Sequence, residues 1–270
     1  MTAQEQKAAA FRDLHAGEAF VIPNPWDAGS ARVLAALGFK ALATTSSGFA
    51  FTLGRLDGNV TLDEVIAHTE ALDSATDLPL SVDLENGYGP EPEDAARAVT
   101  RVAEAGAVGG SIEDYDPAGR LYDRDHAVER VAAAVEAAHA LAFPFTLTAR
   151  AENHLRGNPD LDDTIARLQA FEEAGADVLY APGLHSPDEI RAVCEAVSKP
   201  VNALARADLS LAEIVAAGAR RVSVGGGLTW VALRAMADAA EAIRHDGDFS
   251  ALAVRLPLGE WFAGSSRPAV

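Results

Sequence analysis

The chain alternates between short apolar runs and longer segments in which apolar residues recur at helical spacing. The short runs are rich in Val, Ile, Leu and Thr, which favours strands. The segments between them, such as TLDEVIAHTEALDSA and PEDAARAVTRVAEAG, place apolar residues near positions i, i+3, i+4 and i+7, which favours helices. Eight runs are predicted to be strands: residues 19–24, 41–47, 78–85, 109–114, 145–152, 177–183, 199–205 and 221–227.

Residues at the predicted helix ends support the same alternation. Thr61, Ser186 and Ser210 each precede an acidic residue near the start of a predicted helix, as N-cap residues do. Glycines stand where helices should stop, as in ALGFKAL and EAGADVL. Because strands and helices alternate with short connections, the strands should be parallel. Eight such units in about 250 residues predict a closed α/β fold, the (β/α)8 TIM barrel.

No linker interrupts this alternation, so we expect residues 1–270 to form a single domain. Residues 4–15 predict an extra helix before the first strand. The tail at 257–270 carries Trp261 and Phe262, and large aromatics there should dock on a neighbouring subunit or on the chain's own barrel.

The composition excludes several classes of function. The chain has 22 Lys and Arg against 40 Asp and Glu, a net charge of −18 that repels nucleic acid and anionic lipid surfaces. No apolar stretch resembles a signal peptide or a membrane span, so we expect a soluble, cytoplasmic protein. Cys194 is the single cysteine, which rules out an internal disulfide and a cysteine zinc cluster.

Three carboxylates are predicted to meet at the end of the barrel where chemistry occurs, the C-terminal ends of the strands. Asp83 and Glu85 lie two residues apart in SVDLENGYG and should leave the same face of the third strand. Glu113 ends the fourth strand. Close carboxylates repel one another, and a hard divalent cation keeps them ionised. Oxygen donors alone predict Mg²⁺, with Mn²⁺ as the alternative, and one direct carboxylate ligand would be enough.

Further polar residues are expected at the same rim. The planar fork of Arg150 fits a substrate carboxylate or phosphonate, although the side chain could equally serve as a counter-ion to Glu113 or Glu152. Asn202 is reached by the seventh strand. Residues 46–48 offer hydroxyl and backbone N–H groups to an anionic oxygen.

Five stretches, taken in order, carry a resemblance. They are PNPWDAGSARVLAALGFKALATTSSG, LGRLDG, VDLENGYG, SIEDYD and TARAE. Together they resemble the isocitrate lyase/phosphoenolpyruvate mutase superfamily over about residues 20 to 227. The resemblance implies a barrel that assembles as dimers or tetramers by exchanging the eighth helix, and a Mg²⁺ ion that supports an enolate.

The resemblance also implies roles for individual residues. Ser46, Ser47 and Gly48 match the motif that binds the carboxylate of an α-oxo acid. Asp57 matches an acid close to the metal. Asp83 matches the direct metal ligand, and Glu85 and Glu113 match acids that hold metal-bound waters. Arg150 matches the substrate arginine.

The loop after the fourth strand departs from the best-known members. It reads DYDPAGRLYDRDHAVERV and lacks both the Cys of the isocitrate lyases and the Lys-x-Asn-Ser type loop of the phosphonate enzymes. Residues 114–126 could form either a closing lid or an ordinary surface loop. Tyr88, Tyr115 and His154 are acid/base candidates only.

These observations favour a Mg²⁺-dependent carbon–carbon lyase or decarboxylase that acts on a small α-oxo or α-hydroxy dicarboxylate through a metal-stabilised enolate. Asp57, Glu113 and Arg150 would be its catalytic residues. One alternative is an enzyme that acts on a P–C bond, as phosphonopyruvate hydrolase or phosphoenolpyruvate mutase does. The other is a non-catalytic barrel that binds a metabolite.

Overall fold

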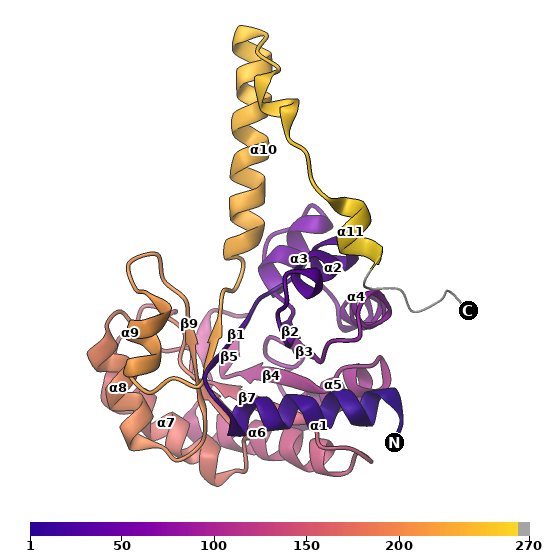
Figure 1. Ribbon diagram of the computed structural model, residues 1–270. Coiled ribbons are helices and arrows are strands. Elements are labelled where there is room, and N and C mark those ends of the chain that lie inside the picture. Colours follow the sequence, from indigo (N-terminus) through magenta and orange to yellow (C-terminus); the bar gives the residue numbers. More distant parts are fainter. Residues whose placement is uncertain (264–270) are drawn as a thin grey trace.

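The eight apolar runs form the eight strands of one parallel sheet in the computed structural model, which describes residues 1–263 (Figure 1). The strands are β1 (Phe20–Ile22), β2 (Leu42–Ala43), β3 (Leu80–Asp83), β4 (Gly109–Glu113), β7 (Thr146–Arg150), β8 (Val178–Tyr180), β9 (Val201–Leu204) and β10 (Arg221–Ser223). The helices are α1 (Ala3–Ala16), α2 (Ala28–Ala36), α3 (Ser46–Thr52), α4 (Leu62–Ala75), α5 (Pro92–Glu104), α6 (Arg124–His139), α7 (Leu161–Glu173), α8 (Pro187–Ala196), α9 (Leu211–Ala216), α10 (Gly227–Asp246) and α11 (Leu258–Ala263), with a 3₁₀ turn at Ser250–Ala253. The predicted (β/α)8 barrel is thus confirmed.

The sheet closes on itself almost completely. The strand order is β1-β10-β9-β8-β7-β4-β3-β2, which leaves β1 and β2 facing each other across a seam. The Ala43 N–H donates to the Pro23 carbonyl at 3.1 Å, and the Asn24 side-chain amide donates to the Thr44 carbonyl at 2.9 Å. These bonds join the two edge strands, so that all the strands end at a common rim.

The strands are shorter than the predicted runs, and the structure differs most from the sequence prediction after β2 and after β4. The second strand was expected to reach Ser47, but β2 ends at Ala43 and residues 46–52 form the short helix α3. The Thr45 hydroxyl accepts a hydrogen bond from the Gly48 N–H at 3.4 Å, which is an N-cap contact that stabilises helix instead of strand. The loop after β4 holds a small hairpin of β5 (Tyr115–Asp116) and β6 (Arg120–Leu121), which the pattern did not indicate.

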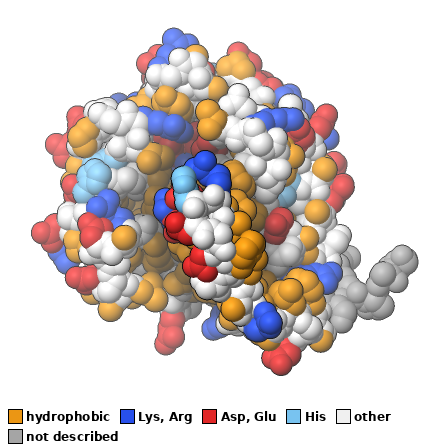
Figure 2. Space-filling model, turned by 90° about the horizontal axis from the view of Figure 1, so that it is seen from above, with side chains coloured by type: hydrophobic (Ala, Val, Ile, Leu, Met, Phe, Trp, Pro, Cys, Tyr) orange, Lys and Arg blue, Asp and Glu red, His pale blue; other side chains and the backbone are white. Residues whose placement is uncertain are grey.

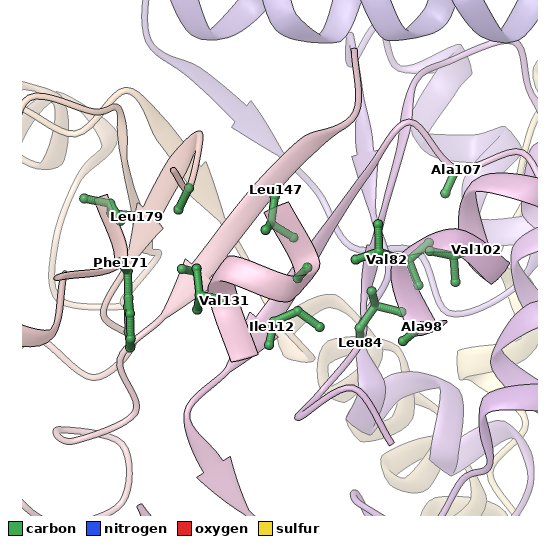
Figure 3. Packing of buried hydrophobic residues seen from close by; sticks show 14 of the residues in the cluster. Val82, Leu84, Ala98, Val102, Ala107, Ile112, Val131, Leu147, Phe171 and Leu179 are labelled. Carbon is green, nitrogen blue, oxygen red and sulfur yellow. The ribbon is translucent and has the colours of Figure 1, made fainter. Parts of the chain in front are cut away.

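The hydrophobic core lies between the barrel and the surrounding helices. Figure 3 shows Val82 and Leu147 of the strands facing Val102 and Val131 of the helices α5 and α6. Each is at most 3% exposed. Burial of such a side chain stabilises the fold by about 1.5–3 kcal/mol, so this layer fixes the positions of the strand ends that carry the polar residues.

Helix α1, the predicted extra helix, covers the opposite end of the barrel. Phe11 is fully buried there, and a Cβ atom at Gly109 would lie 2.7 Å from its ring, so only glycine fits at this position of β4. His15, at the end of α1, packs edge-on against the Phe11 ring.

Helix α10 projects from the barrel, and only Thr229 of its residues is buried (Figure 1). Val231 and Met236 are 68% and 62% exposed. Figure 2, which looks down on this helix, shows hydrophobic side chains along one of its flanks and in the hollow beside it. None of the described helices is long and apolar enough to cross a membrane.

The chain then returns to the barrel as α11, which packs against α2 of the same chain. The Arg32 guanidinium lies 5.7 Å from the centre of the Phe262 ring. Phe262 therefore lies beside α2 of its own chain, and docking of the tail on a neighbouring subunit stays a prediction. The last part of the predicted tail, residues 264–270, lies outside the described residues.

Candidate functional site

A polar cavity of about 280 Å³ opens at the C-terminal ends of the strands. It brings together six of the predicted site residues: Ser46, Ser47, Asp57, Asp83, Arg150 and Asn202. The other three, Gly48, Glu85 and Glu113, lie behind or beside the cavity wall. The barrel thus places the predicted residues in one region, at two depths that the sequence did not distinguish.

Arg150, the last residue of β7, is the centre of an ion-pair network. Its Nη1 lies 3.0 Å from Asp83 Oδ1, and its Nη2 lies 3.0 Å from Glu113 Oε2. Its Nε and Nη2 also donate to Glu152 Oε1 at 3.0 and 2.8 Å. The counter-ion role is therefore present in the structure. Because Arg150 also lines the cavity, the same guanidinium can face a bound anion.

A second arginine at the rim, Arg156, was not singled out from the sequence. Its Nη2 lies 3.3 Å from Glu113 Oε1 and its Nε lies 3.1 Å from Glu152 Oε2. Its guanidinium stacks 3.8 Å from the centre of the Tyr115 ring. Residue 156 lies in a loop beyond the strand, where the strand pattern gives no information. The i, i+4 spacing from Glu152 is the one signal that could have indicated it.

Asp83 and Glu85 do not share a strand face, which corrects the sequence prediction. β3 ends at Asp83, and Glu85 has a φ of 48°, in the left-handed region where the alternation of side chains is lost. Asp83 points into the cavity and accepts hydrogen bonds from the backbone N–H groups of Ser46 at 3.4 Å and Glu85 at 3.3 Å. Glu85 instead accepts a hydrogen bond from the Tyr88 hydroxyl at 3.4 Å and lines a neighbouring groove.

Three of the acids at the rim, Glu85, Glu113 and Asp57, resist ionisation. Burial, with added repulsion from Asp83 and Asp57, raises the pKa of Glu85 to about 7. Burial also raises the pKa of Glu113 well above its ordinary value, although Arg150 opposes the shift. Burial likewise raises the pKa of Asp57, although a hydrogen bond from Ser46 opposes the shift. The rim therefore carries more carboxylates than its arginines can neutralise.

The serine motif contributes two cavity residues and one packing residue. Ser46 and Ser47 line the cavity, and the Ser47 hydroxyl lies 3.2 Å from the Thr45 hydroxyl. Gly48 is buried, and a Cβ atom there would lie 2.6 Å from a methyl carbon of Thr45 and 2.7 Å from the Thr229 hydroxyl. The structure thus gives Gly48 a close-packing role behind the cavity wall.

Asn202 was predicted at the rim but lies inside the barrel, as the second residue of β9, with 1% exposure. Its side-chain amide donates to the Ser223 hydroxyl at 3.0 Å, and its carbonyl oxygen accepts from Arg221 Nε at 2.8 Å. The predicted position of Asn202 at the rim was wrong, because the sequence of a strand does not show which of its residues reach the rim of the barrel.

Arg221, the first residue of β10, forms the inner end of the cavity and was not among the predicted site residues. Its Nη2 donates to the Thr148 hydroxyl at 3.0 Å, and its Nη1 lies 3.2 Å from His15 Nε2. The His15 Nδ1 faces the Phe11 carbonyl at 2.8 Å and must therefore be the protonated nitrogen, so Nε2 accepts from Arg221. Burial, reinforced by Arg221, lowers the pKa of His15 to about 3.

The remaining acid/base candidates lie away from the cavity. His154 is buried, and among the described residues neither of its ring nitrogens has a hydrogen-bond partner. Cys194, which was not an acid/base candidate, lies in α8, where burial raises the pKa of its thiol to about 11. Tyr88 borders the neighbouring groove, and Tyr115 lies under Arg156. In the 114–126 loop, the hairpin is tied by Asp116 and Arg120 at 3.2 Å, and a lid role for this loop stays a prediction.

Comparisons with known proteins agree with this geometry. A family model described as phosphoenolpyruvate phosphomutase matches residues 11–244. A solved structure of a provisionally assigned lyase/mutase from Burkholderia cenocepacia J2315 is 53% identical, with a TM-score of 0.93 and 97% of each chain covered. The oxaloacetate decarboxylase of Paraburkholderia xenovorans is 34% identical over 81% of this chain and 76% of its own length.

A third relative connects the chain to the wider superfamily. The crystal structure of a 2,3-dimethylmalate lyase, a PEP mutase/isocitrate lyase superfamily member, is 27% identical, with a TM-score of 0.84, and the match covers 97% of this chain and 94% of that one. The chain therefore belongs to the phosphoenolpyruvate phosphomutase family and is an enzyme of the isocitrate lyase/PEP mutase superfamily.

Proposed function

We propose that the chain is a Mg²⁺-dependent carbon–carbon lyase or decarboxylase whose substrate is a small α-oxo or α-hydroxy dicarboxylate. The observation that carries this proposal is the charge of the rim, where five carboxylates surround two guanidinium groups. The carboxylates belong to Asp57, Asp83, Glu85, Glu113 and Glu152, and the guanidinium groups to Arg150 and Arg156.

The donor set fits a hard divalent cation. All the donors are carboxylate oxygens, which favour Mg²⁺, or Mn²⁺, over zinc. Within residues 1–263, no three acidic, His or Cys side chains converge to enclose an ion. This arrangement is compatible with Mg²⁺, which keeps several waters and needs few direct protein ligands. Asp83 would contact the cation, because it lines the cavity. Glu85 and Glu113 lie outside the cavity lining but close enough to Asp83 to feel its charge, and they would hold waters of the cation.

The chain's own residues would bind and orient the substrate. The guanidinium of Arg150 and the hydroxyls of Ser46 and Ser47 line the cavity and can donate to a carboxylate. Asp57, which stays open to solvent at the cavity mouth, can take up or release a proton. A bound divalent cation would supply a Lewis acid that withdraws electrons from the α-oxygen of the substrate.

The relatives support cleavage of a C–C bond, since they include an oxaloacetate decarboxylase and a 2,3-dimethylmalate lyase. The name of the matching family model supports a second candidate, an enzyme acting on a P–C bond. Against it, the loop after β4 lacks the Lys-x-Asn-Ser type residues that were expected of phosphonate enzymes.

A substrate panel tests the proposal. The purified protein would be assayed with α-oxo and α-hydroxy dicarboxylates and with phosphonopyruvate, with and without Mg²⁺, for release of pyruvate or glyoxylate. We expect turnover of at least one dicarboxylate, and its loss when the metal is chelated. Turnover of phosphonopyruvate alone would favour the second candidate, and no turnover of any compound would favour a metabolite-binding barrel.

The exposed flank of α10 supports the proposal that copies of the chain associate as dimers or tetramers. Val231 and Met236 lie on a helix that its own barrel leaves uncovered. We expect light scattering to report more than one chain per particle, and charged substitutions at these two positions to reduce the mass. A wild-type monomer at micromolar concentration would contradict this expectation.

A further inference from the structure

The inner end of the cavity is polar, whereas a barrel of this type is ordinarily filled by Val, Ile and Leu. Small polar side chains from neighbouring strands leave space below the rim. These residues line the same cavity as the rim acids: Ser81, Ser111, Asn202, Arg221 and Ser223.

Arg221 is a buried cation that has no acidic partner in the part of the chain that the structure describes. It is 5% exposed, and within residues 1–263 no carboxylate forms an ion pair with it. Its three protein partners, Asn202, Thr148 and His15, are all neutral. Burial lowers the pKa of Arg221 to about 10, so the guanidinium remains charged at neutral pH. Burying an uncompensated charge costs several kcal/mol, which an anionic ligand would offset.

The Arg221 guanidinium also has N–H groups that are not used by its protein partners. Arginine carries five N–H groups, and the three protein contacts use one on Nε and one on each Nη nitrogen. One N–H on each Nη nitrogen is left for a ligand. Two N–H groups in one plane match the two oxygens of a carboxylate.

The depth of Arg221 fits a short dicarboxylate. Its partner Thr148 lies two residues before Arg150 on β7, which corresponds to about 6.6 Å along the strand. Tyr180, whose ring lies 5.3 Å from the Arg150 guanidinium, borders the cavity and is the register partner of Asn202, which accepts from Arg221. One end of an extended diacid can therefore face each arginine.

We propose that Arg221 binds the second carboxylate of the dicarboxylate substrate and thereby sets the specificity of the site for a diacid. This inference rests on the proposed function above. A cation against the second carboxylate stabilises its ionised form and opposes its loss as neutral CO2. It favours a reaction in which that carboxylate gains negative charge.

Cleavage of the C2–C3 bond is such a reaction. In an α-hydroxy dicarboxylate, the C2 hydroxyl loses its proton to a carboxylate of the rim, and C2 becomes the carbonyl carbon of an α-oxo acid. The electron pair of the broken C2–C3 bond passes to C3 and to the carboxylate attached to C3. The extra charge then lies beside Arg221, where a preorganised cation stabilises it. A proton returned to C3 completes the second product, a saturated carboxylate.

Calorimetry in the presence of Mg²⁺ tests the assignment with malate and lactate, which share the α-hydroxy carboxylate and differ in the second carboxylate. We expect the wild type to bind malate at least about 10-fold more tightly than lactate, since a charge-assisted pair contributes about 1.5–3 kcal/mol. Arg221→Met should abolish this preference and leave lactate binding unchanged. Arg221→Lys keeps a positive charge and should retain part of the preference for malate. This variant provides the test if Arg221→Met does not fold. Arg191→Met, a change at an exposed arginine, is the matched control.

An unchanged malate preference in folded Arg221→Met, or an equal loss of malate and lactate binding, would overturn the assignment. If wild type binds neither acid, malate is not a ligand of this chain, the proposed function is decided by the substrate panel, and the anion site is tested with inorganic sulfate in a metal-free buffer. A sulfate-dependent rise in melting temperature for wild type that is absent in Arg221→Met would support an anion site at Arg221. The same rise in both proteins, or in neither, would overturn it.

Discussion

The two ends of the cavity place buried arginines in opposite electrostatic settings. At the rim, Arg150 contacts Asp83, Glu113 and Glu152, and the carboxylates outnumber the cations. At the inner end, the hydrogen-bond partners of Arg221 among the described residues are all neutral. The rim therefore favours an added cation and the inner end an added anion. A dicarboxylate bound together with a divalent cation would supply both charges.

The largest expected effect of breaking this contrast is at Arg150. Arg150→Met would leave three carboxylates near one another without their shared partner, and breaking buried pairs of this kind costs about 3–5 kcal/mol. We expect urea denaturation of the metal-free protein to show a loss of that size in the free energy of unfolding. Arg221→Met removes a charge that has no acidic partner, so its loss should be smaller, below about 2 kcal/mol. Equal losses in the two variants would contradict the contrast.

The second effect concerns the pH dependence of stability at the inner end. His15 has a pKa of about 3 in the folded protein and 6.5 as its ordinary value, so unfolding takes up a proton between these limits. The stability that neutral His15 contributes is present above pH 6.5 and is lost as the pH falls toward 3, by up to a few kcal/mol. His15→Gln should lose less stability between pH 7 and pH 4 in thermal melts. Other groups titrate in both proteins, so the quantity to measure is the difference between the two curves of stability against pH. Parallel curves would contradict the burial of neutral His15.

The sequence predicted the fold because its signals repeat along the chain. Each strand run and each helix end was visible separately, so an error at one boundary, such as the end of β2, did not affect the barrel. Asp83 and Arg150 were also predictable, since both end strands, and the strand ends of a parallel barrel meet at one rim.

The rest of the site depends on features that a linear pattern does not contain. Glu85 lies beyond the end of β3 in a left-handed conformation, so the two-residue alternation of strand side chains does not apply to it and predicted the wrong face. Arg156 reaches the rim from a loop. Arg221 lies in a run that reads as an ordinary strand start, and its lack of an acidic partner is visible only once β7, β9 and α1 are placed around it.

The smallest expected effect is at Arg156, which is 34% exposed and therefore partly screened by water. Arg156→Gln should lower the free energy of unfolding by about 1 kcal/mol in metal-free protein. Saturating Mg²⁺ should reduce that loss, because the cation would offset the same surplus of carboxylates. Denaturation with and without Mg²⁺ would measure the change. An equal loss of stability in both conditions would show that Glu113 does not interact with the bound metal.

In the proposed function, the surplus of carboxylates at the rim serves a divalent cation held by Asp83. Calorimetric titration of Mg²⁺ into wild type, Asp83→Asn and Asp116→Asn measures this directly, and Asp116 is the control because it is an acid of the nearby β5–β6 hairpin that lies outside the cavity. We predict one binding site per chain in wild type and in Asp116→Asn, and an affinity weakened at least about 10-fold in Asp83→Asn. Equal Mg²⁺ affinity in all three proteins, or no binding to wild type, would contradict the account.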